Sequence, residues 1–536
     1  MPTTGSPLAD FPPRRWHLLV AAACVLAIYL AGVTNEWWPT PDSGLYQGLG
    51  RSLIRGEGFR FNGSPQTTVA PGFPAIVGAL GAIFGEGFWA PNLFVALCGL
   101  GSLGLAYLTL ARQTDRRTAF AVVLTVALCY RHYHYAHLIL TDVPFSLLFW
   151  TTAYCCLRAV QGRWAWALAV VPLAAAGVAI RAPGLLLLGP LAFGVALNRS
   201  PQAKVSKRLG VAAILLATLA AMAVCFLLLA QALFDRAPAY LSVAAKHATP
   251  AAQLLDLAVG LYRLPAVVAR VLVGESSLAP VGAFFLLLAV LGAWRLWREG
   301  KRLASTTCLI NFVAVCVLVG HRFLLARYLV ALYPMMLLLV FCGLSWGLEW
   351  LLGRRGRPAP PVVRLRAATV LAGLIIAANA PKILRDGLYY PYAAHTGRYY
   401  EVMRGGQFVD LHPVAAFLHR RCGPNTVVAT RGDRAAMLHF LSRCRTVRFH
   451  KTACRTRADA TAVYRDLLAR PEIDVIVNDT GGLEKRFAYR LAALLDTTPG
   501  IDVLFKGKTC TIYQHQAGRP ASRPAPPTTS TRPAGQ

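Results

Sequence analysis

The sequence predicts a polytopic α-helical membrane protein with a C-terminal α/β domain, and three observations lead to this fold class. Of the 536 residues, 56% are hydrophobic and only 15% are charged, whereas soluble domains carry roughly a quarter charged residues. Apolar runs long enough to cross a bilayer recur along the chain, as at 209–234. Beyond about residue 381, short apolar strands alternate with helical segments.

We expect about eleven membrane spans, with the N-terminus inside. The first apolar run ends without a small-residue cleavage site, so we interpret it as a retained helix and not as a signal peptide. The predicted spans are 16–34, 88–111, 118–136, 142–158, 164–180, 183–198, 209–234, 279–296, 303–320, 325–350 and 363–380.

The formal net charge of +31 supports this topology. Lys and Arg cluster in the short loops on one side of the predicted spans, which is the pattern of cytoplasmic loops. A basic nucleic-acid-binding surface is therefore not indicated, and some of these side chains should meet anionic lipid head groups. We expect a multi-pass protein of the cell membrane, most consistent with a bacterial inner membrane.

The apolar piece 69–84 is too short to be a span, because a bilayer needs about 20 residues. We interpret it as an interfacial or re-entrant segment within a first outer loop at 35–87. A second long outer loop is expected at 235–278. The transmembrane module thus covers 1–380, an extracytoplasmic α/β domain covers 381–516, and the Pro-, Thr- and Ser-rich tail 517–536 is expected to be disordered.

Within the C-terminal domain, we expect helices at 412–421, 434–442, 458–468 and 485–495, with strands at 426–430, 446–449, 473–478, 503–506 and 509–515. This domain contains four of the 13 cysteines, and none forms a CxxC pair. Two of the four are expected to pair in an oxidising compartment, with connectivity left open. They are Cys422, Cys444, Cys454 and Cys510.

Two acidic residues stand out at predicted outer membrane mouths. Asp42 follows Trp37 and Trp38 directly after the first span, where a carboxylate is costly to place without a function. Asp142 precedes Val143 and Pro144 at the start of a later span, where it could instead simply cap a helix. A pair of outer carboxylates suits general-base chemistry or metal binding.

Basic residues on the predicted outer face form a further group of candidates. Arginine side chains suit a phosphate because they donate two parallel hydrogen bonds, although a single one can merely anchor a helix. Tyr46 lies on one face of an amphipathic stretch at 45–56. His134 and His137 are weak metal candidates without a supporting ligand pattern. The basic candidates are Arg51, Arg55, Arg181, Lys246, Arg263 and Arg327.

Several stretches resemble GT-C membrane glycosyltransferases, a superfamily that includes protein O-mannosyltransferase relatives, the lipid A aminoarabinose transferase and the RgtA/B/C/D-like group. The run 42–59 resembles their first outer loop, although Ser43 stands where the family often has Glu. Three later motifs follow in the family's order. They are Ala70-Pro71-Gly72-Phe73-Pro74, Thr141-Asp142-Val143-Pro144 and Arg327-Tyr328-Leu329-Val330-Ala331-Leu332-Tyr333-Pro334.

The resemblance implies that a sugar moves from a polyprenyl-phosphate donor to a lipid, glycan or protein acceptor at the outer face, usually with inversion. It implies that Asp42 is the general base. Asp142 would orient a basic residue or the acceptor, or bind a divalent cation if one is present. Outer basic residues, with Tyr328, would bind the substrates and stabilise the leaving phosphate. No nucleotide cofactor is expected.

Two other classes of function remain open from sequence. A lipid or solute transporter would place charged residues deep within its spans and show related halves, and neither is evident. A non-catalytic scaffold would leave the outer carboxylates and arginines unexplained.

Overall fold

The computed structural model describes residues 15–66, 69–199, 204–234, 249–318, 326–353, 361–403, 408–422, 426–431, 434–449, 461, 465, 467, 469–470, 472–479 and 485–515. The chain forms two compact units. The membrane unit comprises Met1–Trp38 and Tyr46–Tyr399, and the C-terminal unit comprises Pro39–Leu45 and Tyr400–Gln536. The expected tail 517–536 lies outside the described residues.

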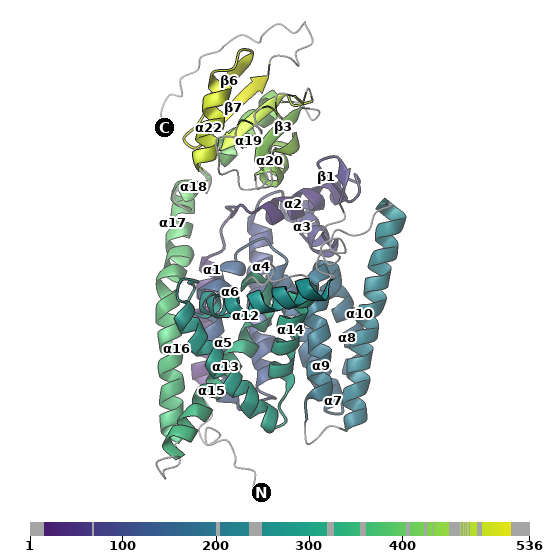
Figure 1. The fold of residues 1–536 in the computed structure, drawn as a ribbon, viewed down its shortest axis with the longest axis vertical. Coiled ribbons are helices and arrows are strands. Elements are labelled where there is room, and N and C mark those ends of the chain that lie inside the picture. Colours follow the sequence, from purple (N-terminus) through teal and green to yellow (C-terminus); the bar gives the residue numbers. More distant parts are fainter. Residues whose placement is uncertain are drawn as a thin grey trace. The chain divides into compact units, whose positions relative to one another are not determined.

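The membrane unit is helical, and Figure 1 shows its long helices running side by side. Its helices are α1 (Arg15–Ala31), α2 (Pro41–Ile54), α3 (Gly72–Phe84), α4 (Trp89–Leu110), α5 (Arg116–Ala127), α6 (Tyr130–Tyr135), α7 (Asp142–Val160), α8 (Trp166–Ile180), α9 (Leu185–Leu197), α10 (Val205–Phe234), α12 (Pro250–Leu272), α13 (Ala279–Arg298), α14 (Leu303–Leu318), α15 (Tyr333–Gly353), α16 (Pro361–Leu384), α17 (Tyr390–His395) and α18 (Tyr399–Val402). Two of these helices are shared with the C-terminal unit: the membrane unit contains α2 from Tyr46 onward, and only the first residue of α18, Tyr399.

Six apolar stretches of the described chain are long enough to cross a bilayer, which makes this a multi-pass membrane protein. They are Trp89–Leu110, Asp142–Val160, Val205–Cys225, Ala279–Arg298, Ala326–Leu352 and Arg366–His395. Five shorter apolar helices add to them, and the piece expected not to span is one of these, Gly72–Phe84. Its 13 residues would extend about 20 Å as a helix, less than the ~30 Å of the hydrocarbon layer.

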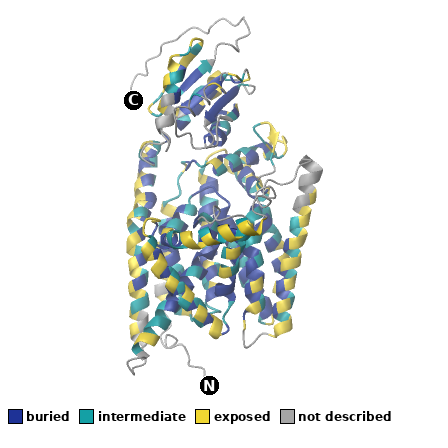
Figure 2. Ribbon diagram, viewed as in Figure 1, coloured by how far each residue is buried: buried dark blue, intermediate teal, exposed yellow. Residues whose placement is uncertain are grey.

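Large apolar side chains cover the outside of the membrane unit, as expected where lipid replaces water. They are conspicuous on α10, α13 and α16, where Figure 2 shows many exposed residues. Examples are Leu228, Phe284, Leu287, Val370 and Leu374, each more than half exposed. An aqueous surface would not carry so many such residues.

The predicted span 118–136 differs from the structure, which divides it into α5 and α6. The break has a physical cause in a buried side chain of α16. Asn379 Oδ1 accepts a hydrogen bond from the Tyr130 backbone N–H at 2.9 Å, which satisfies a free donor at the start of α6. The Asn379 amide also donates to the carbonyl of Leu272 at 2.7 Å. Asn379 of α16 is therefore hydrogen-bonded both to the start of α6 and to the end of α12.

Glycines let α2 and α3 approach at backbone distance within the membrane unit. A Cβ at Gly78 would lie 2.5 Å from the carbonyl oxygen of Gly50, and a Cβ at Gly50 would lie 2.6 Å from that of Pro74. Neither position can hold a side chain without moving a helix. This contact places the amphipathic second half of α2 on the apolar helix α3.

The expected long outer loop 235–278 contains the helix α12, and residues 235–248 lie outside the described part. Figure 1 shows α12 crossing the direction of the long helices. Thr249 caps its start by accepting a hydrogen bond from the Ala252 N–H at 3.3 Å. Leu254, Leu255, Leu261 and Tyr262 are exposed along it.

The C-terminal unit contains a five-stranded mixed sheet of order β4-β3-β5-β7-β6. Its strands are β3 (Val427–Arg431), β4 (Arg445–Phe449), β5 (Val475–Asp479), β6 (Ile501–Lys506) and β7 (Cys510–His515), and its principal helices are α19 (Leu411–Arg421), α20 (Ala435–Ser442) and α22 (Lys485–Asp496). The strands β4, β3 and β5 are parallel, and β7 is antiparallel to both β5 and β6.

These strands and helices agree with the sequence prediction to within two residues, except for the helix expected at 458–468, most of which lies outside the described residues. Short continuous apolar runs predict the central strands β3 and β5, which are buried at consecutive positions and hence on both faces of the sheet. Its core includes Ala429, Ile476, Leu491, Leu495 and Tyr513.

Candidate active site

Asp42 lies half-buried in the first turn of α2. The helix start is fixed by a reciprocal pair of hydrogen bonds, each 3.0 Å long: Thr40 Oγ1 accepts from the Ser43 N–H, and Ser43 Oγ accepts from the Thr40 N–H. This is a capping box in which Ser takes the place of Glu or Gln. Pro41 occupies the first helical position, where its fixed φ is suited. Asp42 thus lies at a helix N-terminus, whose dipole favours a negative charge.

Ser43, which departs from the Glu that the resemblance suggests, takes part in this cap. Its side chain is fully buried and also donates to the Thr40 carbonyl at 2.9 Å. Ser43 therefore orders the segment that carries Asp42. That segment, Pro39–Leu45, belongs to the C-terminal unit, where a Cβ on Gly44 would lie 3.0 Å from the carbonyl oxygen of Ala436 in α20.

Asp142 lies at the other predicted acidic position, at the start of α7, and forms a buried ion pair. Its Oδ1 lies 2.7 Å from Arg181 Nη1, and the two side chains are 2% and 5% exposed. Arg181 also donates to Thr141 Oγ1 at 3.0 Å. Asp142 is the first residue of α7 and does not cap it through its side chain. The structure therefore does not support the alternative in which the Asp142 side chain caps α7.

The same cluster includes the aromatic ring of Tyr328, which lies between two arginines. The guanidinium groups of Arg181 and Arg327 lie 4.8 and 4.9 Å from the ring centroid. Within the described chain, Arg181 Nη2 is buried without a hydrogen-bond partner. Four predicted site residues, Asp142, Arg181, Arg327 and Tyr328, thus come together. The cluster presents positive charge and at least one available N–H donor, which suits an anionic oxygen.

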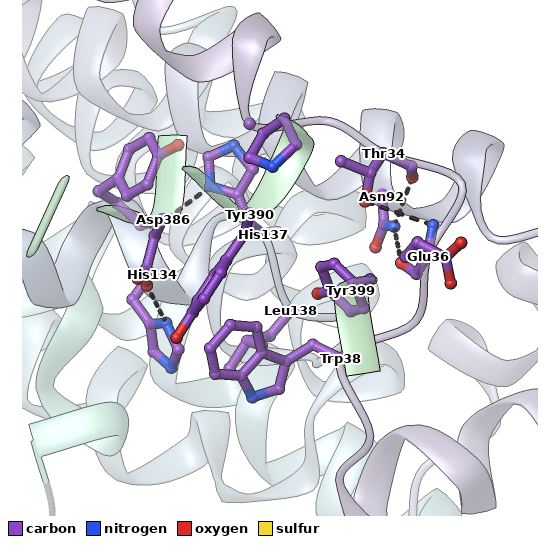
Figure 3. Close-up of a pocket in the computed structure, with 13 residues that line it drawn as sticks. Thr34, Glu36, Trp38, Asn92, His134, His137, Leu138, Asp386, Tyr390 and Tyr399 are labelled. Carbon is purple, nitrogen blue, oxygen red and sulfur yellow. Dashed lines mark hydrogen bonds and ion pairs between the residues drawn. The ribbon is translucent and has the colours of Figure 1, made fainter. Parts of the chain in front are cut away.

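The membrane unit also contains a pocket. Its lining comes from the segment after α1, from α4, from α6 and the segment after it, from the π-helical turn Arg385–Tyr389, and from α17 and α18. Figure 3 shows His134 and Asp386 on one side of it and Thr34, Glu36 and Asn92 on the other. The lining residues are Gly32, Thr34, Glu36, Trp38, Asn92, Tyr133, His134, His137, Leu138, Asp386, Tyr390, Pro391 and Tyr399.

Ionisable and aromatic groups order this pocket. His134 Nδ1 lies 3.3 Å from Asp386 Oδ2, and Arg385 Nε donates to Asp386 Oδ1 at 2.9 Å. The ring of Trp38 meets that of His134 edge to face at a centroid distance of 4.9 Å. Asn92 Nδ2 donates to the carbonyls of Thr34 and Glu36 and so holds the loop between α1 and α2.

The geometry does not favour metal binding by the two candidate histidines. Both ring nitrogens of His137 lie 2.8 Å from backbone carbonyl oxygens, those of Tyr133 and Tyr29, so neither offers a lone pair to a metal. His134 faces Asp386. In the described chain, no three His, Cys, Asp or Glu side chains converge as metal ligands would.

Other predicted residues lie elsewhere. Arg51 and Arg55 both pair with Glu86, at 3.1 and 3.2 Å. Tyr46 is buried and packs edge to face against Phe73 at 5.2 Å. Arg263 is exposed on α12, and Lys246 lies outside the described residues.

Sequence reasoning missed Asp386 and its neighbours. The predicted last span ended at residue 380, whereas the apolar helical segment continues to His395. A π-helical turn, Arg385–Tyr389, lies within it and carries Asp386; such turns are frequent at functional sites. The run Tyr389-Tyr390-Pro391-Tyr392 could have signalled a membrane interface at this depth, because tyrosines concentrate there.

Comparison with known proteins gives the class of this fold. A family model described as dolichyl-phosphate-mannose-protein mannosyltransferase matches residues 68–226, a range that contains Asp142 and Arg181. The structure resembles ArnT from Cupriavidus metallidurans bound to undecaprenyl phosphate, with a TM-score of 0.59 and 15% identity over 94% of this chain and 98% of ArnT.

A second structural neighbour is the oligosaccharyltransferase of Archaeoglobus fulgidus in its apo form. It has a TM-score of 0.55 and 13% identity over 90% of this chain and 71% of the neighbour. Among curated protein sequences, none matches. The chain therefore shares its fold with these membrane transferases, and its segment 68–226 is similar to the mannosyltransferase family model.

Proposed function

We propose that this protein transfers a sugar from a polyprenyl-phosphate donor to an acceptor at the extracytoplasmic face of the cell membrane. The observation that carries the proposal is the cluster of the buried pair Asp142 and Arg181 with the half-buried Arg327 and Tyr328. It provides a preorganised positive site within an apolar helical unit, where a lipid phosphate must be bound. The likeness to ArnT, whose structure contains undecaprenyl phosphate, agrees with such a donor.

In the proposed reaction, the acceptor oxygen or nitrogen attacks C1 of the sugar while the bond from C1 to the phosphate oxygen breaks. Asp42 takes the acceptor's proton, and the polyprenyl phosphate leaves with the bonding electrons. Attack opposite the leaving group inverts the anomeric centre. Arg181 and Arg327 stabilise the negative charge that develops on the leaving phosphate.

Asp142 acts through Arg181 in this scheme. A buried arginine needs a compensating charge, and the 2.7 Å contact with Asp142 supplies it while fixing the direction of the guanidinium group. The contact with Thr141 restrains the same nitrogen. Because the guanidinium group is planar, holding Nη1 also fixes the position of Nη2. Arg181 Nη2 remains available to donate a hydrogen bond to a phosphate oxygen.

The pocket beside His134 and Asp386 offers a place for the polar part of a substrate. Its lining combines aromatic rings with several polar side chains that a substrate could contact. We assign it to the sugar or the acceptor, whose hydroxyl groups can donate to carboxylates such as Glu36 and Asp386.

Reconstituted full-length protein provides the test. Polyprenyl-phosphate sugars of several kinds are supplied with membrane extracts as acceptors, and transfer of labelled sugar is measured. We expect transfer from at least one donor and a loss of 100-fold or more, roughly, in Arg181→Gln, as for removal of one charge-stabilising donor. The matched control Arg60→Gln changes an exposed arginine and should retain activity. Equal activity of Arg181→Gln and wild type would contradict the proposed phosphate site.

A further inference from the structure

Two cysteines of the C-terminal unit lie at the ends of neighbouring elements. Cys422 directly follows α19, and its backbone N–H donates to the Leu418 carbonyl at 2.8 Å. Cys444 lies two residues beyond α20 and directly precedes β4. Arg443, between α20 and Cys444, has a φ of 62°, a left-handed conformation that turns the chain sharply after the helix.

The two residues come together at the end of α19. Cys444 Sγ lies 3.8 Å from the same Leu418 carbonyl oxygen that Cys422 caps. Both residues therefore approach one carbonyl oxygen, Cys422 through its backbone N–H and Cys444 through its thiol. Cys444 is buried, whereas Cys422 is half-buried and accessible to solvent.

We propose that Cys422 and Cys444 form a disulfide in the mature protein. The inference rests on the extracytoplasmic placement of the C-terminal unit in the proposed function, because disulfides persist in oxidising compartments. It selects one pair among the cysteines expected to be outside. Cys510 lies apart from this pair, on β7 in a pocket with Phe408 and Arg434, and Cys454 lies outside the described residues.

The chemistry is a thiol–disulfide exchange in which a small-molecule or protein disulfide is the oxidant. The thiolate of half-buried Cys422 attacks that disulfide, forms a mixed disulfide and releases one thiol. The Cys444 thiolate then attacks the Cys422 sulfur and expels the second thiol. Two protein thiols are oxidised, one external disulfide is reduced to two thiols, and the protons pass to the released thiolates.

The bond would fix α20, because β3 and α20 both lie in the segment that the disulfide closes. The backbone of α20 at Ala436 contacts Gly44, two residues from Asp42. Hydrogen bonds from the ends of both helices already converge here, since His419 Nδ1 lies 3.2 Å from the Ser442 carbonyl. A covalent link at this point would therefore hold the platform on which the Asp42 segment rests.

Peptide mapping of the full-length protein tests the inference. Protein purified without reductant is alkylated under denaturing conditions, digested and analysed by mass spectrometry. We expect a cross-linked peptide that joins Cys422 to Cys444 and disappears after reduction. Cys422→Ser should free Cys444 for alkylation and lower the melting temperature of the C-terminal unit by ~10 °C. The matched control Cys510→Ser should leave the cross-link intact.

Complete alkylation of both thiols without reductant would overturn the inference. Oxidised glutathione, added to the purified protein, then identifies which premise failed. If the cross-link forms in vitro, the geometry is right and the compartment is reducing; if it does not form, the geometry is wrong. Sugar transfer is measured on the same preparation. If the protein is active while both thiols are free, the disulfide is refuted and the proposed function is not.

Discussion

At the scale of single residues, the buried pair of Asp142 and Arg181 combines a stability role with a proposed chemical one. Asp142→Asn leaves the Arg181 charge buried without its counter-charge, which should cost about 3 to 5 kcal/mol of stability. We expect a lower melting temperature in detergent and a loss of sugar transfer.

A double variant separates the two roles. Asp142→Asn combined with Arg181→Gln removes both charges and should recover much of the melting temperature, but not activity. If the double variant instead regained transfer to the wild-type rate, Arg181 would have no part in stabilising the phosphate.

Ser43 provides a second prediction at this scale. Ser43→Ala removes the side chain that accepts from the Thr40 N–H, and loss of such a cap costs about 1 kcal/mol. Transfer should fall because the Asp42 segment is less ordered. Ser43→Thr keeps a hydroxyl acceptor and should retain more activity than Ser43→Ala; equal rates for both variants would argue against the capping role.

At the scale of elements, the approach of α2 to α3 depends on glycine. Gly78→Ala places a Cβ 2.5 Å from a Gly50 backbone oxygen and must move a helix, at a cost of about 1 to 3 kcal/mol. Gly81→Ala, in the same helix, has nothing within 4 Å and should be neutral or slightly stabilising. Thermal melting of both variants compares them directly, and an equal shift would contradict the packing described.

Elements were predicted with unequal success, for physical reasons. The central strands of the C-terminal unit follow from short continuous apolar runs, because their consecutive residues are all buried. The break between α5 and α6 does not, because it depends on Asn379, far away in sequence. Likewise, the group of Asp142, Arg181 and Tyr328 could be named from motifs, but its contacts required the fold. The pairing of Arg51 and Arg55 with Glu86 was not foreseen, since the sequence does not show which charges meet.

At the scale of the whole molecule, orientation in the membrane follows from charge. The basic loops predict that the turn after α7 faces the cytoplasm and that the C-terminal unit lies outside. An epitope tag after Gly500, at a turn of the C-terminal unit, should therefore bind antibody on intact cells or spheroplasts. A tag after Gly162 should bind only after permeabilisation. The reverse pattern would refute the orientation.

Sugar transfer by Asp42→Asn is the most direct measurement of the central claim. The full-length variant is reconstituted with a polyprenyl-phosphate sugar that the wild type uses, beside the control Glu57→Gln, an exposed carboxylate in the same loop. General-base catalysis contributes about 10²- to 10⁴-fold, so Asp42→Asn should lose at least ~100-fold with an unchanged melting temperature, while Glu57→Gln stays active. Transfer by Asp42→Asn within about two-fold of the wild-type rate would contradict the assignment of Asp42 as the base.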